Sequence, residues 1–190
     1  MPDGVKISLI IVRNRNIKTP LPAILKSNIY PYYNDKWECK EMALNGYIGI
    51  MAFTRGKYIS TEKIEPYAHD GSDNYYLIDW ISKQPWCNGS VGMFGGSYLG
   101  FAQWSSLKKI HPALKTIVPQ VAVGAGIDFP ASNGVFMNYC FQWIRFVTDN
   151  PKTNFSEFND SEKWNELNNN WFINGKSFRS LDSLYGKPST

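Results

Sequence analysis

Residues 90–104, SVGMFGGSYLGFAQW, place one serine between an apolar run and a helix-like run. Residues 90–94 are typical of a strand buried in a parallel sheet, and residues 98–110 are typical of a helix. The glycines directly before Ser97 predict a tight strand-to-helix turn, because the neighbours of such a turn must be small. Ser97 would then be exposed above the sheet at a helix N-terminus, where backbone N–H groups favour developing negative charge.

This context is typical of a nucleophile elbow, in which a serine between strand and helix attacks a carbonyl carbon. The usual pattern G-x-S-x-G has glycine where Leu99 stands here, and Gly100 comes one residue later. In an elbow, the backbone N–H of Tyr98 would be one donor of the oxyanion hole. An ordinary turn whose serine caps the helix fits the pattern equally well. The motif by itself therefore leaves a nucleophilic and a structural Ser97 open.

The segments around this motif alternate between strand and helix. Short β-branched, apolar runs predict strands, and apolar residues spaced three or four apart before a glycine or proline predict helices. We expect strands at residues 5–12, 23–30, 47–53 and 90–94, and a further strand within 113–123. We expect helices at residues 36–46, between 72 and 85, and at 98–110. The N-cap of the second helix would be Ser72 or Asp73. This alternation predicts an α/β fold with a parallel sheet and right-handed crossovers.

The composition changes toward the C-terminus. Residues 136–150 predict an aromatic amphipathic helix, and residues 149–174 are rich in asparagine with apolar residues at helical spacing. We therefore divide the chain into residues 1–126, the N-terminal part of an α/β domain, and residues 127–190, the beginning of a helical cap. Because no closing strand follows, we expect an incomplete sheet with an exposed edge.

Composition and charge exclude several classes of function. The 190 residues are 43% hydrophobic and 19% charged, which is enough for one domain with a core. The net charge of +4 is spread along the chain, so we expect no nucleic-acid partner. The sequence has no apolar run long enough for a membrane span, and its first residues lack the pattern of a signal peptide.

Cysteine and histidine are too scattered for a metal site. Cys39, Cys87 and Cys140 are far apart and odd in number, which predicts reduced, structural thiols. The sequence has two histidines, His69 and His111, so we expect no zinc site and no other cofactor.

Residues 65–104, EPYAHDGSDNYYLIDWISKQPWCNGSVGMFGGSYLGFAQW, resemble the CocE/NonD hydrolases, a family that includes the Xaa-Pro dipeptidyl-peptidase group. Further similar segments are DGVKI (3–7), YPYYN (30–34), TRGKYIS (54–60) and HPALKTIVPQVAV (111–123). In this family the elbow has the form G-G-S-Y-x-G, so Leu99 and Gly100 agree with it. The resemblance implies an α/β-hydrolase domain with a helical cap, and serine acyl transfer on esters, amides or peptides.

The resemblance also implies roles for single residues. Ser97 matches the nucleophile, and Tyr32 matches the tyrosine whose hydroxyl is the second oxyanion donor. A phenol can donate to a developing oxyanion without carrying a charge of its own. The acidic residue that the family usually carries two positions before the Arg-Gly pair is Phe53 here, which leaves the anchor of Arg55 undefined.

The partners that would activate Ser97 are not evident. In α/β-hydrolases the order is serine, acid, histidine, and His111 is the one histidine after Ser97. A helix of about ten residues would place His111 roughly 15 Å away, so we expect a structural role for it. His69 is in the wrong order, and Asp128 precedes the position of the family's acid. We therefore expect the chain to be a fragment that lacks the acid and the histidine of its triad.

The substrate is weakly defined by the sequence. Aromatic residues near the elbow and in the cap, among them Phe129 and Trp143, would suit an apolar acyl pocket, although core packing explains such residues equally well. The first hypothesis is a serine hydrolase acting on a small-molecule ester or amide or on a peptide, with an incomplete triad in this chain. The alternative is a non-catalytic α/β module that binds a ligand at the elbow without turnover.

Overall fold

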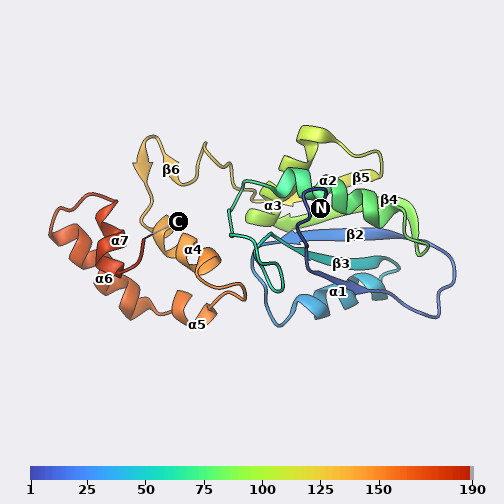
Figure 1. The fold of residues 1–190 in the computed structure, drawn as a ribbon, viewed down its shortest axis with the longest axis horizontal. Coiled ribbons are helices and arrows are strands. Elements are labelled where there is room, and N and C mark those ends of the chain that lie inside the picture. The colour runs from blue at the N-terminus through green and yellow to red at the C-terminus, as the bar shows by residue number, and fades with distance from the viewer. Residues whose placement is uncertain (189–190) are drawn as a thin grey trace. The chain divides into compact units, whose positions relative to one another are not determined.

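The computed structural model describes residues 1–188. Its internal contacts divide the chain into two compact units, Met1–Val123 and Gly124–Thr190 (Figure 1). The division predicted after residue 126 lies close to this boundary.

The first unit contains a five-stranded sheet with helices on both faces (Figure 1). Its strands are β1 (Leu9–Val12), β2 (Leu21–Asn28), β3 (Ile48–Phe53), β4 (Cys87–Gly96) and β5 (Leu114–Gln120). They lie in the order β1-β3-β2-β4-β5, and all neighbours are parallel except β1, which pairs antiparallel with β3. The predicted α/β fold is confirmed, and the antiparallel edge strand is an addition to it.

The helices of this unit are α1 (Asp35–Leu44), α2 (Asp70–Ser82) and α3 (Tyr98–Ser106), followed by the 3-10 turn η1 (Leu107–Lys109). Strand β3 is buried at every position, because its side chains alternate between two cores. Ile50 packs in the core that contains residues of α2, and Met51 packs in the core that contains Cys39 of α1. Helices α1 and α2 therefore cover opposite faces of the sheet.

Helix α2 begins earlier than its sequence predicted. The expected N-cap was Ser72 or Asp73, but the N-cap is His69. The Ser72 hydroxyl donates to the His69 carbonyl at 2.8 Å inside the first turn, so it does not cap the helix. Asp70 is drawn into this turn by a buried hydrogen bond from α3, a tertiary contact that local propensity does not reveal.

The second unit is mostly helical, as predicted, with a small hairpin that was not expected. The hairpin is formed by β6 (Ala131–Ser132) and β7 (Val135–Phe136). The helices are α4 (Tyr139–Thr148), α5 (Phe155–Phe158), α6 (Ser161–Ile173) and α7 (Ser180–Tyr185). Trp164, Leu167 and Trp171 of α6 pack in one cluster with residues of α4 and α7, which confirms the amphipathic pattern.

Candidate active site

Ser97 lies between the end of β4 and the start of α3, and it is exposed. Its backbone has φ 55° and ψ −122°, a combination that residues with a side chain rarely adopt. The Ser97 N–H donates to the carbonyl of Gln120 in β5 at 3.0 Å. The structure therefore holds this serine in a strained turn above the carboxyl end of the sheet, which is the geometry of a nucleophile elbow.

Two glycines make this turn possible. Gly95 has φ 141°, and a Cβ atom there would lie 2.8 Å from the Cβ of Leu99. A Cβ atom at Gly100 would lie 2.8 Å from that of Ala122. The sequence also predicted that Gly96 must be small, but a Cβ atom there would meet nothing closer than 3.4 Å. Space therefore requires glycine at 95 and 100, and the Leu99 side chain fills the room that Gly95 leaves.

The residue after the serine is anchored in the core. Tyr98 is fully buried, and its hydroxyl donates to Oδ2 of Asp70 at 2.8 Å. The same hydroxyl accepts a hydrogen bond from the backbone N–H of Tyr67 at 3.0 Å. Since Tyr98 is the first residue of α3, these contacts fix the helix terminus whose first-turn N–H groups face the elbow.

The Asp70 carboxyl that holds Tyr98 is itself 4% exposed. Burial raises its pKa to about 6, and the hydrogen bond from Tyr98 opposes this rise by favouring the charged form. Within residues 1–188, its second oxygen, Oδ1, has no hydrogen-bond partner. Asp70 was not identified from the sequence, because its partner is 28 residues away.

Gln103 joins the three elements that meet at the elbow. Its buried side-chain amide donates to the carbonyls of Gly95 and Leu99, both at 3.0 Å, and its oxygen accepts from the N–H of Val118 at 2.9 Å. One side chain of α3 thus holds β4, its own first turn and β5 together. Gln103 was not identified from the sequence.

Tyr32 lies in the loop after β2, the strand next to β4. Because parallel strands end at the same edge of a sheet, this loop and Ser97 share one edge. The Tyr32 N–H donates to Oδ2 of Asp35 at 2.7 Å, and Asn28 donates to Oδ1 of the same carboxyl at 3.3 Å. Burial raises the pKa of Asp35 to about 6. This buried carboxyl shapes the Tyr32 loop and was not identified from the sequence.

The Tyr32 ring is 37% exposed and lies 4.0 Å from the ring of Tyr33, centroid to centroid. A hydrogen bond with the Tyr33 side chain is the main cause that raises the pKa of Tyr32 above its ordinary value. A tyrosine hydroxyl can both donate and accept a hydrogen bond. Tyr30, two residues earlier, packs edge-on against Tyr98 with ring centroids 6.2 Å apart.

The two histidines have other partners. Nε2 of His111 lies 3.3 Å from Oδ1 of Asp79. Nδ1 of His111 accepts a hydrogen bond from the N–H of Ala113 at 3.1 Å. His69 lies 3.4 Å from a carboxylate oxygen of Glu65. In the part of the chain that the structure describes, neither histidine hydrogen-bonds to Ser97.

Arg55 has the anchors that the sequence left undefined. It makes a two-pronged contact with Asp73, with nitrogen–oxygen distances of 2.7 and 2.6 Å, and a third contact of 2.5 Å with Asp3. Asp73 lies one turn after Asp70 on α2. The loop after β3 is thereby tied to the helix that also anchors Tyr98.

Phe129 and Trp143 belong to the second unit, where their rings contact each other edge-on at 5.1 Å. Their role in a substrate pocket stays a prediction. Asp128 accepts a hydrogen bond from the N–H of Gly124 at 2.9 Å, a local contact that closes a turn.

Among the described residues no three His, Cys, Asp or Glu side chains lie close enough to hold a metal ion. Cys39, Cys87 and Cys140 are buried and free. No helix within residues 1–188 has the length and apolar character of a membrane span.

Sequence comparison identifies one family. The family model described as X-Pro dipeptidyl-peptidase (S15 family) matches residues 3–178. Cocaine esterase of Rhodococcus sp. (strain MB1 Bresler) is 34% identical over 128 residues, which are 64% of this chain and 22% of that protein. The chain thus spans about a fifth of the length of this relative.

Structural comparison identifies the fold. An α-amino acid ester hydrolase superposes with a TM-score of 0.68 at 23% identity, over 97% of this chain and 38% of that one. A CocE/NonD family hydrolase from Staphylococcus aureus superposes with a TM-score of 0.69 at 20% identity, over 95% and 37%. At these identities the likeness shows the fold, an α/β-hydrolase-type sheet with helices.

Proposed function

Because the chain belongs to the X-Pro dipeptidyl-peptidase (S15) family, we propose that it is part of a serine hydrolase whose nucleophile is Ser97. The observation that carries this proposal is the strained, exposed backbone of Ser97 at φ 55° between β4 and α3. An ordinary serine N-cap has negative φ and accepts a hydrogen bond from the helix, whereas Ser97 makes no such side-chain bond within residues 1–188. Strain of this kind is typical of functional residues.

The proposed reaction is acyl transfer. The Ser97 hydroxyl oxygen attacks the substrate carbonyl carbon while a general base removes its proton. The backbone N–H of Tyr98 and the hydroxyl of Tyr32 donate to the negatively charged oxygen that forms. The leaving group departs with a proton, and water then hydrolyses the ester between substrate and Ser97 in a second step of the same kind.

The general base and its carboxylate partner are proposed to lie outside the described residues. Support comes from His69 and His111, whose ring nitrogens contact Glu65 and Asp79 and make no hydrogen bond to Ser97 in residues 1–188. On this proposal the chain alone holds the nucleophile and both oxyanion donors but turns over slowly, because a serine at its ordinary pKa is a poor nucleophile.

The substrate is proposed to carry an ester, amide or peptide bond. A curated relative is named cocaine esterase, so an ester is the first substrate to test. Phe129 and Trp143 are proposed to contribute to the acyl pocket of the complete enzyme, for which their large apolar surfaces are suited.

A fluorophosphonate probe tests the proposal, since it reacts covalently with activated serines. In the full-length product of the gene that encodes this chain, we expect labelling at Ser97 that the Ser97→Ala variant abolishes. Ser132→Ala, a change at another exposed serine, is the matched control and should label normally. Absence of labelling in the full-length protein would instead support the alternative, a ligand-binding module without catalysis.

The origin of the base needs a separate measurement. We expect residues 1–190 alone to hydrolyse a p-nitrophenyl ester far more slowly than the full-length protein. Enzyme-like rates from residues 1–190 that Ser97→Ala abolishes would show that the chain contains its own base. Tyr32→Phe in the full-length protein should lower kcat by about 10²- to 10³-fold, the usual effect of removing one oxyanion donor, whereas Tyr76→Phe should have little effect.

A further inference from the structure

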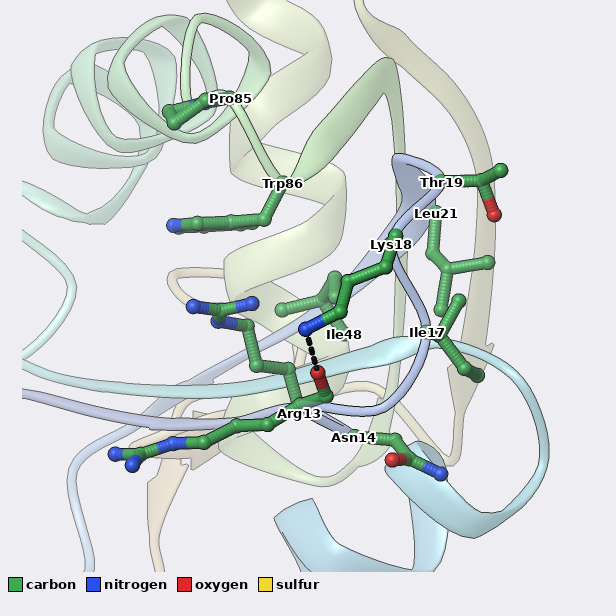
Figure 2. A pocket seen from close by; sticks show the side chains of 10 residues that line it. Arg13, Asn14, Ile17, Lys18, Thr19, Leu21, Ile48, Pro85 and Trp86 are labelled. Carbon is green, nitrogen blue, oxygen red and sulfur yellow. Dashed lines mark hydrogen bonds between the residues drawn. The ribbon is translucent and has the colours of Figure 1, made fainter.

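A cavity lies at the end of the sheet where the parallel strands begin. It has a volume of about 460 Å³. Its lining comes from the connection between β1 and β2, from the first residues of β2 and β3, and from the two residues just before β4 (Figure 2). This volume is in the range of small-molecule sites, which span roughly 300–1,000 Å³.

The cavity is separate from the elbow. Trp86 lines it immediately before β4, and Ser97 follows the other end of the same strand. The ten residues of β4 rise about 3.3 Å each, which places the two sites about 30 Å apart. A ligand in the cavity therefore does not contact the proposed nucleophile.

The lining is strongly cationic. Arg13, Arg15 and Lys18 contribute three positive charges within six residues, and the lining contains no aspartate or glutamate. In the part of the chain that the structure describes, none of these three side chains forms an ion pair, whereas Lys26, Arg55 and Arg145 do. Three uncompensated cations around one cavity repel one another and attract an anion.

The connection that carries these charges has a defined turn. The N–H of Asn16 donates to the side-chain oxygen of Asn14 at 3.0 Å, and the N–H of Ile17 donates to the Asn14 carbonyl at 3.3 Å. The Lys18 ammonium donates to the Arg15 carbonyl at 3.1 Å, as the dashed line in Figure 2 shows. These bonds curl the connection so that its cations gather at the cavity.

The aromatic side chain of Trp86 also lines the cavity. Figure 2 shows the Trp86 ring beside the cavity. The Trp86 carbonyl accepts a hydrogen bond from the N–H of Leu21 at 3.0 Å, and its half-buried ring packs edge-on against Trp80 at 6.2 Å. The ring is therefore held in place and presents an apolar face on which a planar group can stack.

We propose that this cavity binds a phosphorylated small molecule that carries an aromatic ring. The phosphate groups contact Arg13, Arg15 and Lys18, and the ring stacks on Trp86. Each guanidinium group can donate two parallel hydrogen bonds to phosphate oxygens, and the lysine ammonium adds a further positive charge. Two arginines and one lysine therefore suit two linked phosphates better than a single carboxylate. An indole face suits a planar heterocycle such as a nucleobase. A nucleoside diphosphate meets both requirements.

Isothermal titration calorimetry of the full-length protein with adenosine diphosphate tests this proposal. We expect binding that is at least about tenfold tighter than that of inorganic pyrophosphate, which lacks the ring, or of adenosine, which lacks the phosphates. The triple variant R13Q/R15Q/K18Q should bind adenosine diphosphate at least about tenfold more weakly. Trp86→Leu should weaken the binding of adenosine diphosphate but leave the binding of pyrophosphate unchanged.

The control is a second triple variant, K36Q/K40Q/K63Q, which removes three exposed charges elsewhere on the unit and should bind normally. Each single substitution is measured too, so that a folding defect in one triple does not decide the outcome. The proposal is wrong if adenosine diphosphate does not bind, if it binds no more tightly than pyrophosphate, or if both triples weaken it equally.

Discussion

Replacing Tyr98 by phenylalanine removes one buried hydroxyl and keeps the ring. The hydroxyl is the only side-chain donor to Asp70 within residues 1–188, and it also accepts the N–H of Tyr67. A hydrogen bond to a charged group contributes about 1.5–3 kcal/mol, and a neutral one about 1 kcal/mol. At pH 8 we therefore expect Tyr98→Phe to lower the free energy of unfolding by about 3 kcal/mol.

This loss should depend on pH in a defined direction. The hydrogen bond from Tyr98 favours the charged form of Asp70, so its removal raises the pKa of Asp70 further above about 6. Above that pKa the variant keeps a buried charge without its donor, and the full loss is present. As the pH falls through the pKa both proteins protonate Asp70, so the loss should decrease to about 1 kcal/mol at pH 5.

Urea denaturation of the full-length protein and the variant, at pH 8 and pH 5, measures both quantities. The control is Tyr76→Phe, which removes the hydroxyl of a tyrosine that is 40% exposed and should change stability by no more than about 0.5 kcal/mol. An equal loss at both pH values would refute the role of the Asp70 charge. A loss no larger than that of the control would refute the anchor itself.

Three further predictions concern the first unit. Gly95→Ala should lower the free energy of unfolding by more than about 2 kcal/mol, because the new Cβ would lie 2.8 Å from that of Leu99. In the same urea titration, the control Gly96→Ala should lower it by about 1 kcal/mol or less. Gln103→Leu should cost about 2–4 kcal/mol, since it leaves two buried carbonyls and one N–H without this partner; a loss below 1 kcal/mol would contradict the contact. Burial lowers the pKa of Lys57 to about 7. Between about pH 7 and 10, the Lys57 amine therefore carries a proton in the unfolded chain but not in the folded protein. Stability should therefore rise with pH across that window, and Lys57→Met should remove the rise.

The fold was largely predictable because its signals are local. The fully buried β3 is a continuous apolar run, and α2 ends shortly before Pro85. The antiparallel pairing of β1 was not predictable in this way, since a four-residue strand carries no mark of its direction. The two-residue strands of the β6–β7 hairpin are likewise too short for a period-two pattern.

The candidate site was predictable only where the motif was contiguous. Ser97 and its neighbours stand together in the chain, so their pattern could be read directly. Asp70 reaches Tyr98 across 28 residues, and Arg55 reaches Asp73 across 18, so each pair becomes visible only when α2 packs beside α3 and the loop after β3. Asp35 was missed for another reason. A carboxylate in the first turn of a helix is usually a solvated capping group, but this one is buried.

The strained conformation of Ser97 can persist because the first unit stabilises it from several sides. A residue held in a sparsely populated region costs of order 1–3 kcal/mol. The Ser97 N–H bonds to Gln120 of β5, Gln103 fixes the carbonyl of Gly95, and Asp70 of α2 holds Tyr98. At about 1 kcal/mol for each neutral bond and about 1.5–3 kcal/mol for the bond to the Asp70 carboxylate, these anchors together outweigh the strain. All of them lie within Met1–Val123, so the elbow is formed by this unit alone. On the proposed mechanism, the general base would therefore meet a serine that is already oriented, and the position of the base, not that of Ser97, would govern the rate.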